Sequence, residues 1–475
     1  MTNGRTSGAA RAFLSVLGVG LAAVVGAGTA AQAQSLDNFA SAVQSGADNT
    51  AEVTQSGQRN RAGTETLPMA QDGFFNGLVI DQTGQDNQIA TSGAGLSQQN
   101  AFGTATHANS ATLSQTGDLN EIGEILQQVL GLSGGAGNRL DIDQRDGDGN
   151  VVRRVEQVQN AATPGQTAEV TMSGFGNRID LLRQVSASDL SGEENDVFVY
   201  IDGENNGTTA LRGYAGYTAA LASEIVQRRG SEDTGSNGNQ VSLQIFGASN
   251  AFGVLQRGRI NRAGAIVITG DGNAIGVEQD GTENDIILAT IEGGNNEVGM
   301  TQLGTNVAEL SLRGISDDNQ VLIDQMGTND GYVQIDGHRN EVVMRQGFAL
   351  SAGGDNDASI DVEGYDNFAD LQQQGDNSFI AQITGSSNNT TTGFSSPAGA
   401  GYLPGTYRQE GFGNAATLAV TGDANLSSYF QQGLGNLISL EVTGSENEAL
   451  LLQFGNGSAA AVTQTGRANV AVIMQ

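Results

Sequence analysis

From Asn414 to the C-terminus, hydrophobic and polar positions repeat every 11 residues, the interval between Asn414 and Asn425. Within one unit, apolar Ile438, Leu440 and Val442 alternate with polar Ser439 and Glu441. Alternation with a period of two places one set of side chains on one face of a β-strand. We therefore predict one short strand per unit, with the second, fourth and sixth residues after an Asn facing the interior.

A Gly and an Asn separate each predicted strand from the next. The pattern Q-x-G-x-x-N is found intact from Gln44, Gln55, Gln82, Gln115, Gln256, Gln279, Gln409, Gln431 and Gln464, and looser copies keep only G-x-x-N. Near the C-terminus the Asn positions advance by one unit at a time, through Asn414, Asn425, Asn436, Asn447 and, beyond Ser458, Asn469. An 11-residue step also fits an α-helical supercoil, but Gly and Asn are poor residues for a helix interior. We expect strands joined by tight turns, in which Gly supplies a positive φ or a close backbone approach.

The Gln positions reveal a second, doubled period. In every second unit the same position is occupied by Gln, at Gln409, Gln431, Gln453 and Gln475. The units between them have Val420, Val442 and Gln464 at this position. Two units therefore make one coil, and winding the chain stacks Gln on Gln at the ~4.7 to 4.9 Å spacing of paired strands. In such a column each buried amide can donate to one neighbour and accept from the other. The predicted fold is an all-β solenoid with about 22 residues per coil, and with loop insertions mainly in the N-terminal half.

The residues of these stacked columns are the candidate functional residues. The predicted ladder residues are Gln44, Asn49, Gln55, Asn60, Gln82, Asn87, Gln115, Asn120, Gln256, Asn261, Gln279, Asn284, Gln409, Asn414, Gln431, Asn436, Gln453, Gln464, Asn469 and Gln475. The predicted turn glycines are Gly46, Gly57, Gly411, Gly422, Gly433, Gly444, Gly455 and Gly466.

A signal peptide is predicted over residues 1–33. Arg5 and Arg11 precede an apolar stretch, and Ala31, Gln32 and Ala33 match an A-x-A cleavage site. The mature chain would begin near Gln34, with irregular repeats over residues 34–243 and regular repeats over 244–475. A short helix is predicted over Leu221 to Arg229, within one of the insertions.

Composition excludes several kinds of chemistry. The 475 residues include no Cys and no Lys, which rules out thiolate nucleophiles, zinc-thiolate sites and Schiff bases. The two His residues, His107 and His338, lie in no catalytic motif, and we expect no enzyme activity and no cofactor. A net charge of −31 and a pI near 4.1 disfavour nucleic acid and anionic membranes as partners. Beyond the leader no apolar run approaches the ~18 residues of a membrane helix, so no membrane insertion is expected.

An acidic cluster leaves one alternative open. Asp141, Asp143, Asp146, Asp148 and Asn150 resemble calcium ligands in spacing. An EF-hand loop opening at Asp146 would need Gly where this chain has Val151, so a polar turn is the favoured interpretation and no metal site is predicted.

A secreted β-helix polysaccharide lyase is the less favoured alternative, because the sequence has no evident cluster of Asp with Arg.

The repeat resembles that of the curlin family, Q-x-G-x-x-N-x-A-x-x-x-Q. It matches at Gln44, Gly46, Asn49, Ala51 and Gln55, and again at Gln464, Gly466, Asn469, Ala471 and Gln475. This family consists of secreted subunits that polymerise outside Gram-negative cells into curli, the amyloid fibres of biofilm matrix. The resemblance implies a β-solenoid that stacks end to end, export by way of the periplasm through a dedicated outer-membrane pore, and nucleation by a related subunit.

The ends of a solenoid point to the same function. Repeats begin at Gln44 and continue to Gln475, so no polar capping segment is evident, and an uncovered strand edge is a template for another chain. Head-to-tail contacts that do not close generate filaments. Acidic turn residues such as Asp48, Asp86, Asp118 and Glu446 are expected to oppose lateral clumping, so acid should accelerate assembly. The alternative is a non-polymerising surface adhesin whose inserted loops bind a partner.

Overall fold

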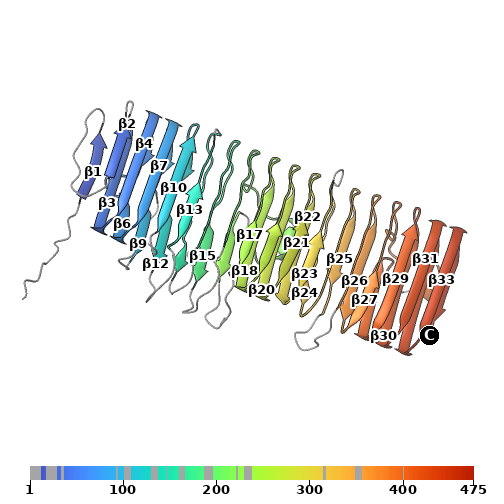
Figure 1. Ribbon diagram of the computed structural model, residues 1–475. Helices are drawn as coiled ribbons and strands as arrows, with labels where there is room; N and C mark the ends of the chain where they lie inside the picture. Colours follow the sequence, from blue (N-terminus) through green and yellow to red (C-terminus); the bar gives the residue numbers. More distant parts are fainter. Residues whose placement is uncertain are drawn as a thin grey trace, which may run out of the picture. The chain divides into compact units, whose positions relative to one another are not determined.

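The computed structural model describes residues 12–17, 29–33, 37–92, 95–100, 109–129, 137–145, 147–159, 166–186, 196–220, 223–228, 238–313, 317–347, 356–399 and 401–475. They form two compact units, Met1–Thr208 with Ser223–Ala248 and Arg257–Arg259, and Thr209–Ala222 with Ser249–Gln256 and Ile260–Gln475. Each unit is a parallel β-solenoid, and the chain makes about 16 turns at a spacing of about 23 residues (Figure 1). The predicted all-β solenoid is confirmed.

The first unit has two facing walls of parallel strands. Wall A carries β3 (Phe39–Ala47), β5 (Arg61–Ala62), β6 (Met69–Phe74), β8 (Gln88–Ile89), β9 (Leu96–Asn100), β11 (Glu121–Ile122), β12 (Ile125–Val129), β14 (Val158–Gln159), β15 (Leu182–Ser186) and β16 (Ile225–Arg228). Wall B carries β4 (Thr50–Gln58), β7 (Gly77–Gln85), β10 (Ser110–Thr116), β13 (Arg139–Ile142) and β17 (Gln240–Ser242). Short insertions split three strands of wall A in two, as between β5 and β6, which both pair with β3.

The second unit repeats this arrangement. Its wall A carries β18 (Ala251–Arg259), β20 (Ala274–Thr282), β22 (Glu297–Gly304), β24 (Gln325–Met326), β25 (Glu341–Arg345), β26 (Phe368–Gln374), β28 (Thr406–Phe412), β30 (Leu426–Leu434), β32 (Glu448–Asn456) and β34 (Val470–Met474). Its wall B carries β19 (Arg262–Ala265), β21 (Asp285–Ala289), β23 (Val307–Leu310), β27 (Asn377–Ile380), β29 (Asn414–Thr421), β31 (Leu437–Ser445) and β33 (Ala459–Arg467).

Alternation of side chains decides what each strand buries. In β31 the apolar residues Ile438, Leu440 and Val442 are at most 2% exposed, whereas Ser439 and Glu441 face solvent. Each strand pairs in register with its equivalent one coil away, so Leu440 lies between Leu418 and Val462. The core is therefore a narrow apolar strip between the walls, in which each residue packs on a similar one.

The coil length varies along the chain because insertions lie at the turns. Successive coils are 22 residues apart at Gln431 and Gln453, 23 apart at Gln279 and Gln302, and 27 apart at Gln44 and Gln71. The helix predicted over Leu221 to Arg229 is wrong in its described part. Ile225–Arg228 is strand β16, which pairs in parallel with β15, because its alternating side chains fit the next place in wall A.

Two segments of the predicted leader are described, and both are strands of the first unit. β1 (Ala12–Leu17) pairs antiparallel with β3, and β2 (Thr29–Ala33) pairs in parallel with β4. These two strands lie against the first strands of wall A and wall B. Without them, the outer edges of β3 and β4 lose their partners among the described residues.

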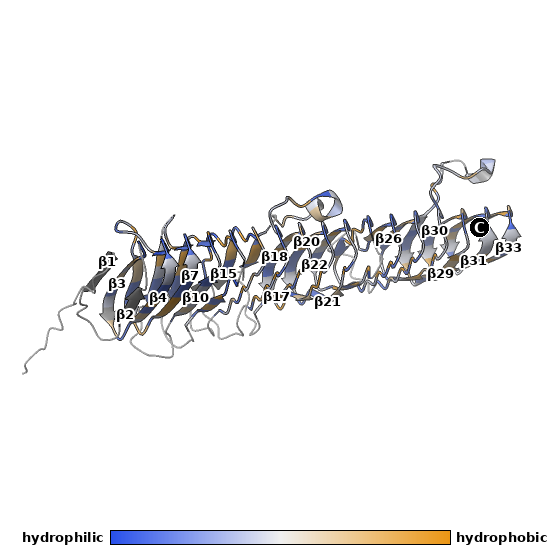
Figure 2. Ribbon diagram, turned by 90° about the horizontal axis from the view of Figure 1, so that it is seen from above, coloured by the Kyte–Doolittle hydropathy of each residue, from blue (hydrophilic) through white to orange (hydrophobic). Residues whose placement is uncertain are grey.

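Two longer insertions of the second unit lie on the outward face of wall A. Residues 209–220, which include the short 3-10 helix η2 (Gly213–Tyr217), lie beside β20 and β22 (Figure 2). A Cβ on Gly276 or Gly299 would come within 2.2 or 2.0 Å of the backbone oxygens of this insertion, so these strand glycines make room for it. The second insertion, residues 389–405 with the 3-10 helix η3 (Pro397–Gly399), rises from the face that carries β30 (Figure 2).

The turn glycines form columns of their own. A Cβ on Gly433 would lie 1.7 Å from the carbonyl oxygen of Gly455, and one on Gly422 would lie 2.0 Å from that of Gly444. Both residues also have a positive φ. The backbone of one coil therefore passes so close to the next that only Gly fits.

We expect Gly433→Ala to destabilise the second unit by about 2 to 5 kcal/mol, because it combines a clash with backbone strain. Gly435→Asn is the matched control, since Gly435 has φ +65° and no atom within 4 Å of the added Cβ. Asn tolerates this conformation, so the control should cost less than about 1 kcal/mol. Thermal unfolding followed by circular dichroism measures both, and equal melting temperatures would contradict the glycine column.

Candidate functional site

A ladder of Gln side chains runs through the interior of wall A in the second unit. Gln409 Nε2 donates to Gln431 Oε1 at 2.7 Å, Gln431 to Gln453 at 3.0 Å, and Gln453 to Gln475 at 3.2 Å. Each amide also donates to a backbone oxygen of wall B, as Gln431 does to Ala415 at 3.2 Å. Gln409, Gln431 and Gln453 have no exposed surface, so stacking satisfies amides that burial would otherwise penalise.

The first unit carries Gln ladders in both walls. In wall A, Gln44 donates to Gln71 at 2.7 Å. In wall B, Gln55 donates to Gln82 at 2.7 Å and Gln82 donates to Gln115 at 2.8 Å. Gln44 and Gln55 therefore belong to separate columns, although they occupy adjacent repeat units in the sequence.

Asn side chains form a second kind of ladder at the turns. Asn447 N–H donates to Asn425 Oδ1 at 3.1 Å, and Asn469 N–H donates to Asn447 Oδ1 at 3.0 Å. The same bond joins Asn60 to Asn38 and Asn87 to Asn60 in the first unit, at 2.9 and 3.1 Å. The Nδ2 of such an Asn donates to a glycine carbonyl of the next coil, as Asn447 does to Gly466 at 3.0 Å. Each ladder Asn therefore bonds to the coils on both sides of it.

Wall B differs from wall A in its column at the Gln place. In the second unit, Val420 and Val442 occupy this place and are fully buried. Gln464 follows them in β33, and its Oε1 is buried with no hydrogen-bond partner among the described residues. A polar side chain thus ends an apolar column, and one of its two polar atoms is unsatisfied.

The structure places the predicted ladder residues on these columns in register, except that Gln464 stacks on Val442 and not on another Gln. Sequence reasoning missed further members. Gln71 begins an intact Q-x-G-x-x-N pattern but was not among the predicted ladder residues. In three further coils the turn between Gln and Asn is one residue shorter, after Gln302, Gln325 and Gln373. Gln98, Gln127, Gln157, Gln184 and Gln227 are also fully buried, and several of them are separated from the next ladder Asn by an insertion. Permitting a variable gap between Gln and Asn would have found them.

The predicted turn glycines fall into three groups. Gly57, Gly411, Gly422, Gly433 and Gly444 have positive φ and lie under a glycine of the next coil. Gly46 pairs in register with Gly73. Gly455 and Gly466 also have positive φ, but a Cβ on either would meet at most one atom within 4 Å, because no described residue covers them.

Several acidic turn residues are engaged in specific contacts. Asp86 forms an ion pair with Arg59, and Glu446 forms one with Arg467. These arginines lower the pKa of both carboxyls. Asp118 Oδ1 accepts the Gln85 N–H at 2.7 Å, and Asp48 is exposed. Asp86 and Glu446 are therefore neutralised by arginines, whereas Asp48 is exposed to solvent.

Among the described residues, the candidate catalytic and metal-binding side chains do not form one site. His338 Nδ1 lies 3.5 Å from Asp317 at a turn, whereas His107 and Asp146 lie outside the described residues. Of the acidic cluster, Asp143 pairs with Arg145, and Asp148 accepts the Asp118 N–H at 2.7 Å. No group of three or more His, Asp or Glu in the described part of the chain is arranged to hold a metal ion. No helix there is long and apolar enough to cross a membrane.

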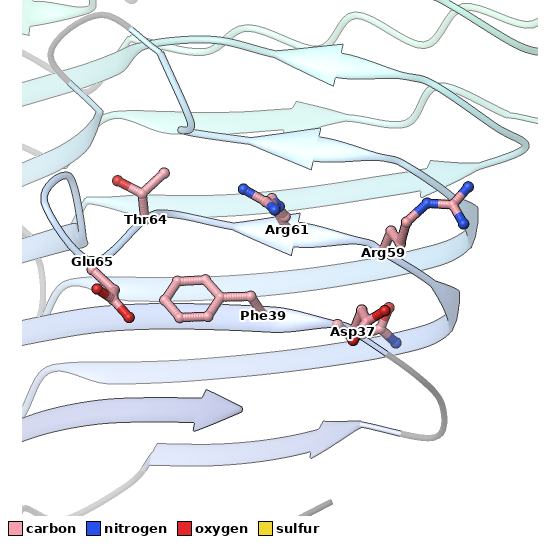
Figure 3. Close-up of a pocket in the computed structure, with 7 residues that line it drawn as sticks. Asp37, Phe39, Arg59, Arg61, Thr64 and Glu65 are labelled. Carbon is pink, nitrogen blue, oxygen red and sulfur yellow. The ribbon is translucent and has the colours of Figure 1, made fainter. Parts of the chain in front are cut away.

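A pocket of about 510 Å³ lies beside the first strand of wall A in the first unit. Phe39 of β3 and Arg61 of β5 are paired in register and both line it, with Thr64 and Glu65 on the adjoining insertion (Figure 3). Phe39 faces outward from β3, because Asn38 and Ala40 on either side of it are buried. The outward side of the first coil thus carries an aromatic ring.

No model of a known protein family matches this chain, and no curated protein is significantly similar to it.

We expect Gln431→Glu to destabilise the second unit by about 3 kcal/mol or more at pH 7, because it buries a charge and leaves Gln453 Oε1 without its donor. Burial raises the pKa of a carboxyl in the folded chain above its value in the unfolded chain. The loss should therefore shrink as pH falls through that raised pKa. Thr465→Glu, at an exposed position of β33 whose register partner is Thr443, is the control and should change the stability little. Urea unfolding at pH 7 and pH 4 measures both, and equal effects at the two positions would refute the ladder.

Proposed function

We propose that this chain is a secreted structural protein, a curli-like subunit that assembles head to tail into extracellular fibres of a biofilm matrix. The last strand of wall A, β34, would pair with the first strand, β3, of a second copy. The observation that carries the proposal is a match of spacing, because Asn469 precedes Gln475 by the same interval as Asn38 precedes Gln44. One register therefore continues both ladders from copy to copy.

The outward side chains at this joint are also compatible. Val470 and Met474 are 54% and 56% exposed on β34. In the register of the ladders, Val470 lies over Phe39 and Met474 lies over Val43. Burying exposed apolar side chains against one another favours association by about 25 cal/mol per Å² of apolar surface removed from water.

The Gln amides of the two end coils donate in the same direction. Gln453 Nε2 donates to Gln475, and Gln44 Nε2 donates to Gln71, so in both end coils the amides donate toward higher residue numbers. A head-to-tail joint continues this direction, with Gln475 donating to Gln44. Two like ends would pair their strands antiparallel, unlike the parallel pairs of β34 with β32 and of β3 with β6, which disfavours a symmetric dimer.

The predicted leader bears on when the joint forms. β1 occupies the edge of β3 that would receive β34, so its removal is required for assembly. When β34 pairs with β3 of a second copy, wall B has one empty strand place between β33 of the first copy and β4 of the second. In the full chain, β2 occupies this place beside β4. The unsatisfied Gln464 Oε1 is at the edge of the same empty place. Where the leader is cleaved therefore decides whether the joint has a wall B strand.

Replacing Val472 tests the joint. Gln475 exchanges hydrogen bonds with Leu452 and Phe454 of β32, so by alternation the Val472 N–H faces away from β32. Val472→Pro should leave the coil folded and remove one donor of the joint. The mature chain should form fibres with cross-β diffraction, and Val472→Thr should elongate fibre seeds as the wild type does. Val472→Pro should add to seeds and then stop growth at that end. Elongation by Val472→Pro at the wild-type rate would overturn the proposal.

Acid should shorten the lag before fibres form. Burial raises the pKa of Asp285, Asp324, Asp361 and Asp370, so these carboxyls lose their charge before the exposed ones as the pH falls. Protonation lowers the repulsion between mature copies, whose net charge without Arg5 and Arg11 of the predicted leader is −33, against −31 for the full chain. Thioflavin fluorescence of the mature chain at pH 7, 6 and 5 measures the lag. An unchanged lag would exclude charge as the brake on assembly.

A secretion pore of the outer membrane, export through the periplasm of a Gram-negative cell, and a nucleating subunit accompany the curlin resemblance and belong to the same proposal. Chains that stay monomeric after removal of the leader would favour the surface adhesin instead.

A further inference from the structure

The insertion at residues 389–405 covers part of the outward face of wall A. Leu450 and Leu452 point outward from β32, between the inward Ala449, Leu451 and Gln453, yet they are 0% and 2% exposed. The Ser395 N–H contacts both carboxylate oxygens of Glu448, at 3.1 and 3.0 Å, and ties the insertion to the same strand. The insertion is thus packed on the wall.

Beside this covered region lies a pocket of about 410 Å³. The insertion contributes Tyr402 and Leu403, and the outward face of wall A contributes Arg408, Phe430 and Phe454. The two phenyl rings have centroids 5.5 Å apart and are tilted by 55°. Arg408 lies over the ring of Phe430, 5.8 Å from its centroid. Two aromatic rings from adjacent coils therefore form one side of the pocket.

These rings occupy places that are polar in other coils. The residue before the wall A Gln is Asp324, Arg345 and Gln372 in three coils, whereas it is Phe430 in β30. Phe454 is 48% exposed, and the pocket also includes Leu403, which is 58% exposed. Clustered exposed apolar side chains on a charged protein mark a binding site.

A network of planar polar groups borders the rings. Arg408 forms an ion pair with Glu410 at 2.5 Å, and Gln432 Nε2 donates to Glu410 Oε2 at 3.0 Å. The ion pair neutralises the guanidinium, so the edge of the pocket offers donors and acceptors without a net charge. These groups are already oriented by one another, which lowers the entropy lost when a ligand is bound.

We propose that this pocket binds a neutral saccharide. A sugar ring has a C–H face that can pack on Phe430 and Phe454 of the lining. Its rim of hydroxyls can bond to Arg408 of the lining, and to Glu410 and Gln432 beside the pocket. The volume lies within the range of ligand pockets, and its mixture of aromatic and polar lining suits such a ring better than an acyl chain or an anion. This site lies on the side of the solenoid, so binding does not depend on the fibre joint.

Titration calorimetry tests the proposal on the monomeric full chain. The probes are the hexasaccharides of β-1,4-linked glucose, β-1,4-linked N-acetylglucosamine and α-1,6-linked glucose, with hexagalacturonate as the anionic comparison. At least one neutral probe should bind, and Phe430→Ala and Phe454→Ala should each weaken it at least about tenfold. Phe412→Ala is the control, because Phe412 is 50% exposed in β28 and does not line the pocket.

Three results would overturn the site: no neutral probe binds, only hexagalacturonate binds, or both pocket variants bind as the wild type does. The outward rings make little contribution to the core, so the two variants should keep the melting temperature of the Phe412→Ala control. Loss of the saccharide with normal fibre growth would separate this site from the proposed assembly.

Discussion

The fold depends on the vertical stacking of identical amides. A buried Gln or Asn is costly unless its donors and acceptors are satisfied, and here each amide finds its partner in the same residue one coil away. Stacking requires that every coil place its amide at the same point, whatever lies between. The narrow turns that achieve this bring backbones so close that glycines such as Gly433 stack on glycines as well.

This constraint leaves much of the molecule free. Outward side chains need only be compatible with their neighbours, so an ion pair such as Arg339 with Asp366 can join two turns, and the aromatic pair Phe430 and Phe454 can lie on the outward face of wall A. Insertions are tolerated where they leave the columns intact. The proposed saccharide pocket arises in this way, because residues 389–405 pack on an outward face without disturbing the Gln column beneath.

The same constraint connects fold with proposed function. A column has no intrinsic length, so the groups that join one coil to the next within a chain are those that would join one chain to another. The matched spacing of Asn38 to Gln44 and Asn469 to Gln475 gives the register, and parallel pairing of the strands gives the head-to-tail direction. Wall B contributes less to the joint, since pairing β34 with β3 leaves empty the place in wall B that β2 occupies beside β4.

By itself, the sequence determined the strand, the coil of two units and the stacked Gln and Asn, because a regular coil imposes its period on the chain. It did not show that Gln98 or Gln127 belongs to the same ladder as Gln44, since insertions break the period while the position in space is kept. The sequence also predicted a helix that includes Ile225–Arg228. This segment is a strand in the structure, because its alternating side chains pair it with β15 in wall A. Only the tertiary structure brought Phe430, Phe454 and Tyr402 to one pocket, because their contacts arise between coils and between a coil and an insertion, at separations that no local pattern records.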